Sequence, residues 1–362
     1  MSSNQRTKPT VAVVFGGHSN EHDVSLHSAA AVLGAFDGDR HTALPVGITR
    51  TGDWYRYRGP VEAIADGSWE RRTADLTPVA VSPNRSVHGL LELGAAGISV
   101  VPLACAFPVL HGRFGEDGTV QGMFELAGIP LVGCTTLASA LAMDKERAHR
   151  VAAAAGIAVP RSVAVESWER AYAAQGLKAA GIGFPLFVKP ARSGSSHGIS
   201  LVQSPSELEG ALDRAFAVDG TAILEERVEG FEVGCAVVGS GKRLLTGLVD
   251  EIELAGGFLD YAEKYERATA VIHMPARVDG QTSTRITQTA LKVYRALGCS
   301  GFARVDLFLT PDGTIVFNEV NTIPGLTAMS RFPAMMRGAG YELPELVSLL
   351  VANALEEATH DL

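Results

Sequence analysis

The sequence predicts an α/β protein of two or three domains. Its 362 residues exceed what a single hydrophobic core usually serves. Residues 10–17 form a β-branched apolar run that ends in two glycines and leads into a helical pattern, as at the start of an α/β domain. Residues 302–322 alternate apolar and polar side chains around a turn, which is typical of an antiparallel hairpin. We expect domains over 1–133, 134–228 and 229–362.

The predicted helices and strands are separated by recognisable turn and loop sequences. After the first strand and a helix over 21–36, a strand at 104–110 runs into the loop HGRFGEDG (111–118). The pattern then predicts an alanine-rich helix over 136–155 ended by Gly156, two strands within 184–203 joined by a Gly/Ser loop, a strand at 222–228, a long loop over 256–268, a helix over 284–297, the hairpin, and a helix over 343–357.

Composition excludes several classes of protein. The chain has 31 basic and 40 acidic residues, and a net charge of −9 argues against a nucleic-acid partner or an anionic membrane surface. Its four cysteines are far apart without a CxxC pair, so neither a zinc site nor a disulfide scaffold is indicated. No apolar signal core is present, and prolines interrupt the longest uncharged stretch, residues 93–112. We therefore expect a cytoplasmic protein without a membrane span.

The hairpin carries the clearest local chemistry. If Asp312 and Gly313 form a two-residue turn, Asp306 faces Glu319 and Arg304 faces Asn321 on the same side of the sheet. Facing carboxylates repel unless something neutralises them, and oxygens from Asp, Glu and Asn suit Mg²⁺. Because such magnesium sites are usually completed by water and phosphates, the hairpin suggests a nucleotide. A solvated sheet face with scattered charge is the alternative, and a shift of one residue in register would break the pairing.

Two further signals are weaker when taken alone. The loop ARSGSSHG (191–198) offers glycines and serines to phosphates just after Lys189, but it is not the GxxxxGK[ST] loop. The N-terminal glycine turn leaves a helix N-terminus free to face an anion, but its spacing is not GxGxxG, which disfavours a Rossmann dehydrogenase. Lys145 on the alanine-rich helix is by itself best interpreted as a solvated lysine.

Together these segments resemble the D-alanine–D-alanine ligase family, which has the ATP-grasp fold. The resemblance covers residues 11–350 and rests on these motifs: FGGHSNEHDVSLHSA (15–29), FPVLHGRFGEDGTVQG (107–122), MDKERAHR (143–150), FVKPARSGSSHGISLV (187–202), DYAEKY (260–265), GFARVDLFL (301–309) and FNEVNTIPGLTAMSRFP (317–333). The family includes D-alanine–D-serine and D-alanine–D-lactate ligases of the vancomycin-resistance type.

The resemblance implies three lobes: a Rossmann-like pre-ATP-grasp domain (1–133), a small ATP-grasp lobe (134–228) and a large lobe (229–362). It implies an ATP-dependent ligase that makes a D-alanyl-D-amino acid dipeptide through a D-alanyl phosphate, for peptidoglycan precursor synthesis. It also implies a homodimer that binds D-alanine, a second D-amino acid, ATP and Mg²⁺ or Mn²⁺, with two metal ions.

The resemblance further assigns roles to individual residues. The catalytic group comprises Glu21, Ser195, Tyr265, Arg304 and Gly325, of which Arg304 and the Gly325 N–H form the oxyanion hole. The substrate-binding group comprises Glu21, His111, Ser330 and Arg331. The ATP-binding group comprises Lys145, Lys189, Ser196, Glu225, Glu226, Val228, Glu232 and Lys264. The metal ligands are Asp306, Glu319 and Asn321. Lys264 and Tyr265 belong to a loop that closes over the site, and Tyr265 would join Glu21 through Ser195.

Each assignment has a simpler alternative. Glu21 could favour a helix N-terminus, His111 could be a satisfied loop histidine, and Ser195 could be an ordinary turn residue. A non-catalytic nucleotide-binding protein on the same fold is the competing class. That alternative predicts loss of a metal carboxylate or of Arg304, and the sequence keeps them.

The second substrate stays open between D-alanine and D-serine. In SRFP (330–333), an arginine stands where the D-alanine–D-alanine enzymes carry an apolar residue, and a guanidinium can donate to a serine hydroxyl. Residues 259–278 also look like the D-alanine–D-serine subgroup, whereas Tyr265 argues against D-lactate. Arg331 could instead point to solvent or pair with an acidic neighbour.

Overall fold

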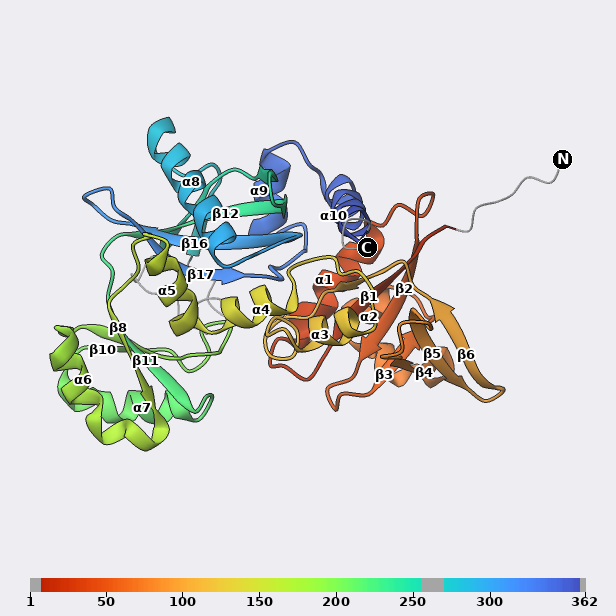
Figure 1. Ribbon diagram of the computed structural model, residues 1–362, viewed down its shortest axis with the longest axis horizontal. Coiled ribbons are helices and arrows are strands. Elements are labelled where there is room, and N and C mark those ends of the chain that lie inside the picture. The colour runs from red at the N-terminus through yellow and green to blue at the C-terminus, as the bar shows by residue number, and fades with distance from the viewer. Residues whose placement is uncertain (1–7, 255–269, 359–362) are drawn as a thin grey trace.

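The α/β class is confirmed by a computed structural model that describes residues 8–254 and 270–358 (Figure 1). Three β-sheets are seen in these residues. In Figure 1 the second sheet lies at the lower left, the third at the top and the first at the right, with α4 and α5 between them. Within the described ranges, no helix has the length and apolar character needed to cross a membrane.

The first sheet has the strand order β6-β5-β4-β3-β2-β1-β7. Its elements are β1 (Thr10–Gly16), α1 (His22–Gly34), β2 (Thr42–Ile48), β3 (Trp54–Tyr57), α2 (Glu62–Ala65), β4 (Leu76–Val81), β5 (Gly89–Gly94), β6 (Gly97–Pro102), β7 (Cys105–Pro108) and α3 (Thr119–Leu126). β1 pairs in parallel with β2 and β7, and residues 11–15 are fully buried, which explains their continuous apolar run. Gly16 must be glycine because its φ is 88° and a Cβ would collide with the carbonyl of Ile48.

The second sheet has the order β10-β9-β11-β8 and is covered by α6 and α7. Its elements are β8 (Ser162–Glu166), α6 (Ala173–Ala180), β9 (Leu186–Pro190), β10 (Ser200–Val202), α7 (Leu208–Phe216) and β11 (Thr221–Glu226). The two predicted strands joined by a Gly/Ser loop are confirmed as the antiparallel pair β9 and β10.

The third sheet has the order β15-β14-β12-β16-β17, and β13 pairs with β12. Its elements are β12 (Phe231–Ser240), β13 (Arg243–Thr246), β14 (Asp250–Leu254), β15 (Ala270–His273), α8 (Gly280–Ala296), β16 (Phe302–Leu309) and β17 (Ile315–Asn321), followed by α9 (Arg331–Gly338) and α10 (Leu343–Glu357). The predicted loop over 256–268 lies outside the described residues.

The predicted alanine-rich helix is wrong as a single element. It is two helices, α4 (Thr136–Met143) and α5 (Lys145–Ala154), separated at Asp144. Asp144 has an extended backbone, and its carboxylate accepts a hydrogen bond from the Arg147 N–H, so it caps α5. The break places Lys145 at the first turn of a new helix.

The predicted two-residue turn of the hairpin is also wrong, although the pairing deduced from it is confirmed. The turn has three residues, 311–313, because the Thr310 N–H donates to the Thr314 carbonyl. Gly313 has a φ of 81°, as expected at the last position of such a loop. A bulge at Asn318 then shifts the register back, so that Asp306 faces Glu319.

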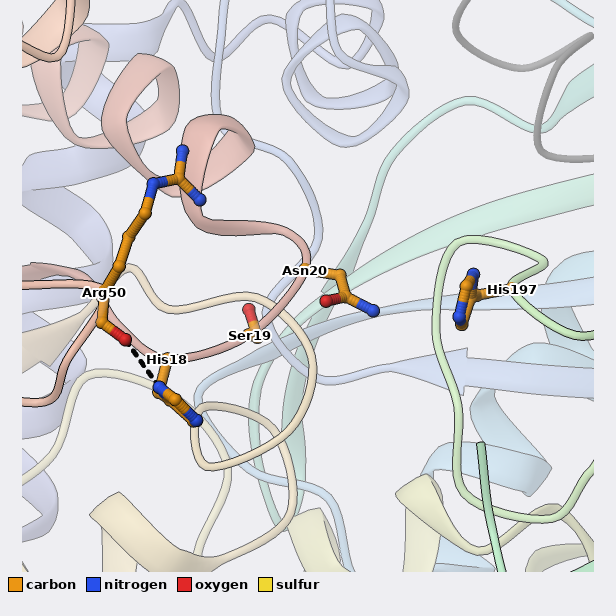
Figure 2. Close-up of a pocket in the computed structure, with 5 residues that line it drawn as sticks. All are labelled: His18, Ser19, Asn20, Arg50 and His197. Carbon is orange, nitrogen blue, oxygen red and sulfur yellow. Dashed lines mark hydrogen bonds between the residues drawn. The ribbon is translucent and has the colours of Figure 1, made fainter. Parts of the chain in front are cut away.

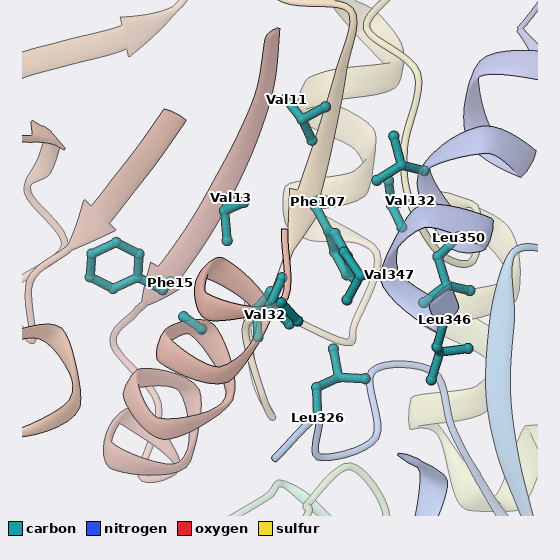
Figure 3. Packing of buried hydrophobic residues seen from close by; sticks show 14 of the residues in the cluster. Val11, Val13, Phe15, Val32, Phe107, Val132, Leu326, Leu346, Val347 and Leu350 are labelled. Carbon is teal, nitrogen blue, oxygen red and sulfur yellow. The ribbon is translucent and has the colours of Figure 1, made fainter. Parts of the chain in front are cut away.

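The C-terminal helix packs both on the first lobe and on the lobe that carries it. Figure 3 shows Leu346, Val347 and Leu350 of α10 in one cluster with Val11 and Phe107. Leu326, which follows β17, is fully buried in the same cluster. The segment after the hairpin is therefore anchored in a core that the first and third lobes share.

Candidate functional site

Loops from the first two lobes face each other across a cleft of about 590 Å³. Figure 2 shows Ser19 and Asn20, just before α1, opposite His197 of the Gly/Ser loop. The predicted residues Glu21 and Ser195 directly adjoin these segments. The cleft therefore opens where the sequence predicts the first substrate.

Glu21 and Ser195 are brought together as expected. The Ser195 hydroxyl donates a hydrogen bond to the Glu21 carboxylate. A Cβ on either Gly112 or Gly194 would collide with Glu21 Oε2, so glycines on two different loops leave room for this carboxylate. Ser195 has a φ of 49°, a left-handed conformation that costs energy outside glycine and is often found at functional sites.

Lys145 is not a solvated lysine, since its side chain is only 9% exposed. Its Nζ donates to the Ser193 carbonyl over 2.7 Å and lies 3.2 Å from Glu319 Oε2. Lys145 therefore connects the Gly/Ser loop with the hairpin. A cation at this junction is well placed to meet phosphate oxygens bound between the two.

The other ATP-binding candidates cluster at the second sheet. Lys189 Nζ donates to Glu225 Oε1 over 2.6 Å, and both side chains are buried. The Glu226 carboxylate accepts hydrogen bonds from Arg161, and the Glu226 N–H donates to the Arg161 carbonyl over 3.0 Å. Glu225 Oε2 is buried and has no hydrogen-bond partner among the described residues. Ser196 follows Lys189 in the Gly/Ser loop, and Val228 follows Glu226 in the sequence. Both residues are partly buried.

The hairpin brings its polar residues together. Asp306 pairs with Glu319, and Arg304 pairs with Asn321. Arg304 donates to both oxygens of Asp306, with Nε–Oδ1 2.8 Å and Nη2–Oδ2 2.7 Å. Asn321 Nδ2 lies 2.9 Å from Asp306 Oδ2. The two facing carboxylates are thus neutralised by cations, by Arg304 on one side and by Lys145 on the other.

The donor set of the hairpin fits a hard divalent cation. Two carboxylates and one amide offer only oxygen ligands for such an ion, and rotating the Asn321 amide presents its oxygen. Within the part of the chain that the structure describes, no three His, Cys, Asp or Glu side chains converge as a metal cluster. A cation held by Asp306, Glu319 and Asn321 would therefore need further ligands from phosphates and water.

His111 lies beside Glu21, but its ring is fully engaged. Nδ1 donates to the Ile323 carbonyl over 2.8 Å, and Nε2 accepts from the Ser28 hydroxyl over 3.0 Å. Burial is the main cause that lowers the pKa of His111, while Glu21 acts in the opposite direction. In this arrangement His111 is a neutral, fixed ring, which matches the alternative of a satisfied histidine.

Ser330 lies close to Gly325. A Cβ on Gly325 would lie 2.8 Å from Ser330 Oγ. The same hydroxyl lies 2.8 Å from Thr327 Oγ1, and it accepts from the Thr327 N–H at 3.2 Å. The expected oxyanion donor and the expected carboxylate-binding serine therefore stand together at the start of α9.

Arg331 is paired with acidic neighbours, which is one of the two alternatives left open by the sequence. It is held by Asp250 (Nε–Oδ2 2.7 Å, Nη2–Oδ1 2.9 Å) and by Glu232 (Nη1–Oε1 2.9 Å). Nη2 also lies 3.4 Å from Asp306 Oδ1. A Cβ at Gly234 would collide with this guanidinium, so the strand leaves a space for it.

Glu232, which the sequence assigns to the ribose, has its carboxylate on Arg331. Burial is the largest influence on its pKa and raises it, although Arg331 lowers it. The ribose role stays a prediction, and it requires this carboxylate to serve both groups. Lys264 and Tyr265, assigned to the closing loop, lie outside the described residues.

Comparison with known proteins agrees with this geometry. A family model described as D-ala D-ala ligase N-terminus matches residues 10–134, and one described as D-ala D-ala ligase C-terminus matches residues 151–352. The chain belongs to the D-alanine–D-alanine ligase family.

Individual members are similar over their whole length. The D-alanine–D-alanine ligase of Chlorobium luteolum is 44% identical, and the match covers 96% of this chain and 97% of that protein. The vancomycin B-type resistance protein VanB of Enterococcus faecalis is 43% identical over 96% and 99%. The crystal structure of the VanG D-Ala:D-Ser ligase of Enterococcus faecalis aligns with a TM-score of 0.90 and 49% identity, over 96% and 100%.

Membership in the D-alanine–D-alanine ligase family defines the fold and the class of reaction. The fold is ATP-grasp, and the protein is an ATP-dependent ligase that forms carbon–nitrogen bonds. Membership in this family therefore argues against the alternative of a non-catalytic nucleotide-binding protein. D-alanine ligases and vancomycin-resistance proteins both occur among its relatives, in line with a role in peptidoglycan precursor synthesis.

Two residues of the ligase site were missed by the sequence analysis. Asp250 holds Arg331, and Glu116 accepts hydrogen bonds from the N–H groups of Gly112 and Ile323. The signal for Glu116 was its position within HGRFGEDG, a motif used only as a whole. Asp250 had no usable local signal, because its partner is 81 residues away.

Proposed function

We propose that this ligase joins D-alanine to a second D-amino acid, with D-alanine as the main second substrate and D-serine also accepted. The observation that carries the proposal is the convergence of three lobes on one site. Glu21 comes from the first lobe, its partner Ser195 from the second, and the Arg304–Asp306 pair from the third. No single lobe contains the full set of residues that acyl transfer requires.

Binding of the first substrate uses Glu21, whose carboxylate suits the ammonium group of D-alanine. Ser195 fixes the carboxylate, and Tyr265 would join Glu21 through this serine. Lys145 and Lys189 approach the ATP phosphates, and Ser196 adds a donor from the loop. The unpartnered Glu225 Oε2 is a suitable acceptor for the amino group of adenine.

In the first step a carboxylate oxygen of D-alanine attacks the terminal phosphorus of ATP, and ADP leaves. Lys145 balances negative charge near the transferred group, while Asp306, Glu319 and Asn321 would hold magnesium. When bound, the metal neutralises charge on the phosphates. The product is a D-alanyl phosphate, whose mixed anhydride hydrolyses unless water is kept out.

In the second step the amine of the second substrate attacks the acyl carbon. The developing oxyanion receives hydrogen bonds from Arg304 and from the Gly325 N–H. The amine loses a proton, the carbon–nitrogen bond forms, and inorganic phosphate leaves with the original carboxylate oxygen. Ser330, which lies close to Gly325, would bind the carboxylate of the second amino acid.

Acceptance of D-serine is supported by Arg331 and by similarity to the VanG D-Ala:D-Ser ligase. Arg331 follows Ser330 directly in the sequence, and we propose that its guanidinium borders the second pocket. Asp250 and Glu232 already use most of its donors, so a serine hydroxyl would have to compete for the remaining N–H. This competition favours dual acceptance over strict selection of D-serine. We also predict, from Tyr265, that D-lactate is a poor substrate.

The test is ATP-dependent phosphate release with D-alanine alone and with D-alanine plus D-serine, with the dipeptides identified by mass spectrometry. We expect D-Ala-D-Ala from the first mixture and additional D-Ala-D-Ser from the second. Arg331→Leu should lower the ratio of kcat/KM for D-serine over D-alanine, whereas Arg337→Leu on the exposed face of the same helix should not. An unchanged ratio would remove Arg331 from recognition of the hydroxyl.

The further details of this function are also proposals. We infer two Mg²⁺ ions, or Mn²⁺ in their place, because phosphates between Lys145 and the hairpin would need neutralisation from more than one side. We propose a homodimer in the cytoplasm, by analogy with the family. Metal titration of activity and sedimentation of the purified chain test these points.

A further inference from the structure

Ile323, in the segment that follows the hairpin, has both its main-chain N–H and its carbonyl hydrogen-bonded to side chains of the first lobe. Glu116 Oε1 accepts a hydrogen bond from the Ile323 N–H over 2.9 Å. His111 Nδ1 donates to the Ile323 carbonyl over 2.8 Å. Both side chains come from the loop after β7, in the first lobe, and reach 207 and 212 residues along the chain.

The second carboxylate oxygen of Glu116 binds the loop that lies against Glu21. Glu116 Oε2 accepts from the Gly112 N–H over 2.9 Å. Gly112 is one of the two glycines against which the Glu21 carboxylate rests. The Ser19 hydroxyl, near the start of α1, donates to the His111 carbonyl over 2.7 Å. A single carboxylate therefore connects the loop beneath Glu21 with the main chain of Ile323.

Ile323 stands between two functional positions, two residues after Asn321 and two before Gly325. Just beyond Gly325, the Leu326 N–H donates to the Ser28 hydroxyl over 3.3 Å, and the Leu326 side chain is fully buried in the core shared by the first and third lobes. The segment is thus held at Ile323 and at Leu326. The Gly325 N–H lies between these two attachments, so its position relative to Glu21 depends on both.

An acidic side chain is a costly choice at this position. The pKa of Glu116 is raised to about 7, mainly by burial and also by the nearby charge of Glu21. A glutamine of equal size would avoid this cost. It would, however, offer one acceptor oxygen where two N–H groups need one each. The arrangement therefore points to a need for both hydrogen bonds.

We propose that Glu116 is a positioning residue that holds the Ile323–Gly325 segment against the first-substrate loop, and so aligns the Gly325 N–H with the carboxyl group bound near Glu21. This inference rests on the proposed function. Glu116 touches neither substrate nor nucleotide in this role, since both of its oxygens are bound to main-chain N–H groups. Misalignment by a fraction of an ångström lowers the rate of the chemical step more than it affects binding.

The test compares Glu116→Gln with Asp117→Asn in the full-length enzyme. Asp117 is a matched control because it also accepts two main-chain hydrogen bonds, from Phe114 and Thr119, but both lie within its own lobe. Steady-state rates of phosphate release give kcat and the KM values for ATP and D-alanine, and thermal melting reports folding. The wild-type rate with D-alanine tests the proposed function, and the ratio of variant to wild type tests the role of Glu116.

We expect Glu116→Gln to lower kcat by about tenfold or more, with the KM for ATP within about twofold of wild type. Asp117→Asn should change kcat by less than about twofold. A folded Glu116→Gln enzyme with a kcat near wild type overturns the proposal. If that variant does not fold, Glu116→Asp takes its place, because it keeps the charge but is too short to span both N–H groups. Failure of both variants to fold would show a purely structural role and also overturn the proposal.

Discussion

Ser195 and Glu21 are separated by 174 residues and by the boundary between two lobes, and they are joined by one hydrogen bond from hydroxyl to carboxylate. The backbone of Ser195 adopts a left-handed conformation to present this hydroxyl. The bond fixes the orientation of the Glu21 carboxylate. It also makes the Gly/Ser loop part of the first-substrate site.

Ser195→Ala should therefore weaken use of the first D-alanine. A hydrogen bond to a charged group contributes about 1.5–3 kcal/mol, so kcat/KM for the first D-alanine should fall by roughly tenfold to a hundredfold. Steady-state kinetics at saturating ATP measure this. Ser206→Ala, at an exposed position beyond β10, serves as control. A change within twofold in Ser195→Ala would separate Ser195 from the function of Glu21.

Glu319→Gln should nearly abolish turnover and leave the fold intact. The substitution removes one of two carboxylates available for magnesium, and we expect a fall in kcat of about a hundredfold or more. Circular dichroism and magnesium titration of activity accompany the rate measurement. Glu169→Gln, at an exposed glutamate of the second lobe, should behave as wild type. Near-normal turnover of Glu319→Gln would exclude this residue from the metal site.

Arg331→Leu should also destabilise the fold. The side chain is 11% exposed, and its removal leaves the buried carboxylate of Asp250 and the partly buried carboxylate of Glu232 without their cation. Loss of one partner of such a buried pair typically costs about 3–5 kcal/mol. Urea unfolding of Arg331→Leu and of Arg337→Leu measures the difference, since Arg337 is exposed on the same helix. Equal unfolding free energies in the two variants would mean that the acidic pairing contributes little.

The stability of the enzyme should depend on pH through Glu116. Its pKa in the folded protein is raised to about 7, first by burial and then by Glu21, from an ordinary value of 4.5. A raised carboxyl pKa favours the protonated, folded form. The stabilisation that protonated Glu116 gives to the folded state is therefore fully present below pH 4.5 and is lost as the pH rises through 7. The difference amounts to at most about 3 kcal/mol.

Unfolding free energies of wild type and Glu116→Gln at pH 5 and pH 8 test this prediction. The wild type should lose stability relative to the variant between these two values, because the glutamine does not titrate. Other groups are common to both proteins and cancel in the comparison. A difference between the two proteins that is the same at pH 5 and pH 8 would show that the pKa of Glu116 is not raised.

The sequence predicted the hairpin pairing for a reason that was only partly right. The alternation of side chains and the Asp-Gly pair indicated the hairpin, but not the length of the turn. A longer turn and the bulge at Asn318 offset each other, so Asp306 still faces Glu319. Bulges have no reliable sequence signal, because they depend on the packing around the strand.

Contacts between distant segments were the least predictable part of the site. The positions of Lys145 and Ser195 followed from family resemblance, whereas local pattern alone favoured a solvated lysine and a turn serine. The pairing of Arg331 with Asp250 depends on the order of strands in the third sheet and on the open space at Gly234. The contact between Glu116 and Ile323 depends on how two lobes dock, which a local pattern does not encode.

In the proposed reaction the D-alanine carboxylate is phosphorylated and then attacked by an amine. D-alanine labelled with ¹⁸O in both carboxylate oxygens tests it most directly, with ATP and magnesium present and the released phosphate analysed by mass spectrometry. One ¹⁸O atom is expected in each phosphate released, because the carboxylate oxygen leaves with the phosphoryl group. Unlabelled phosphate, released together with dipeptide, would contradict it.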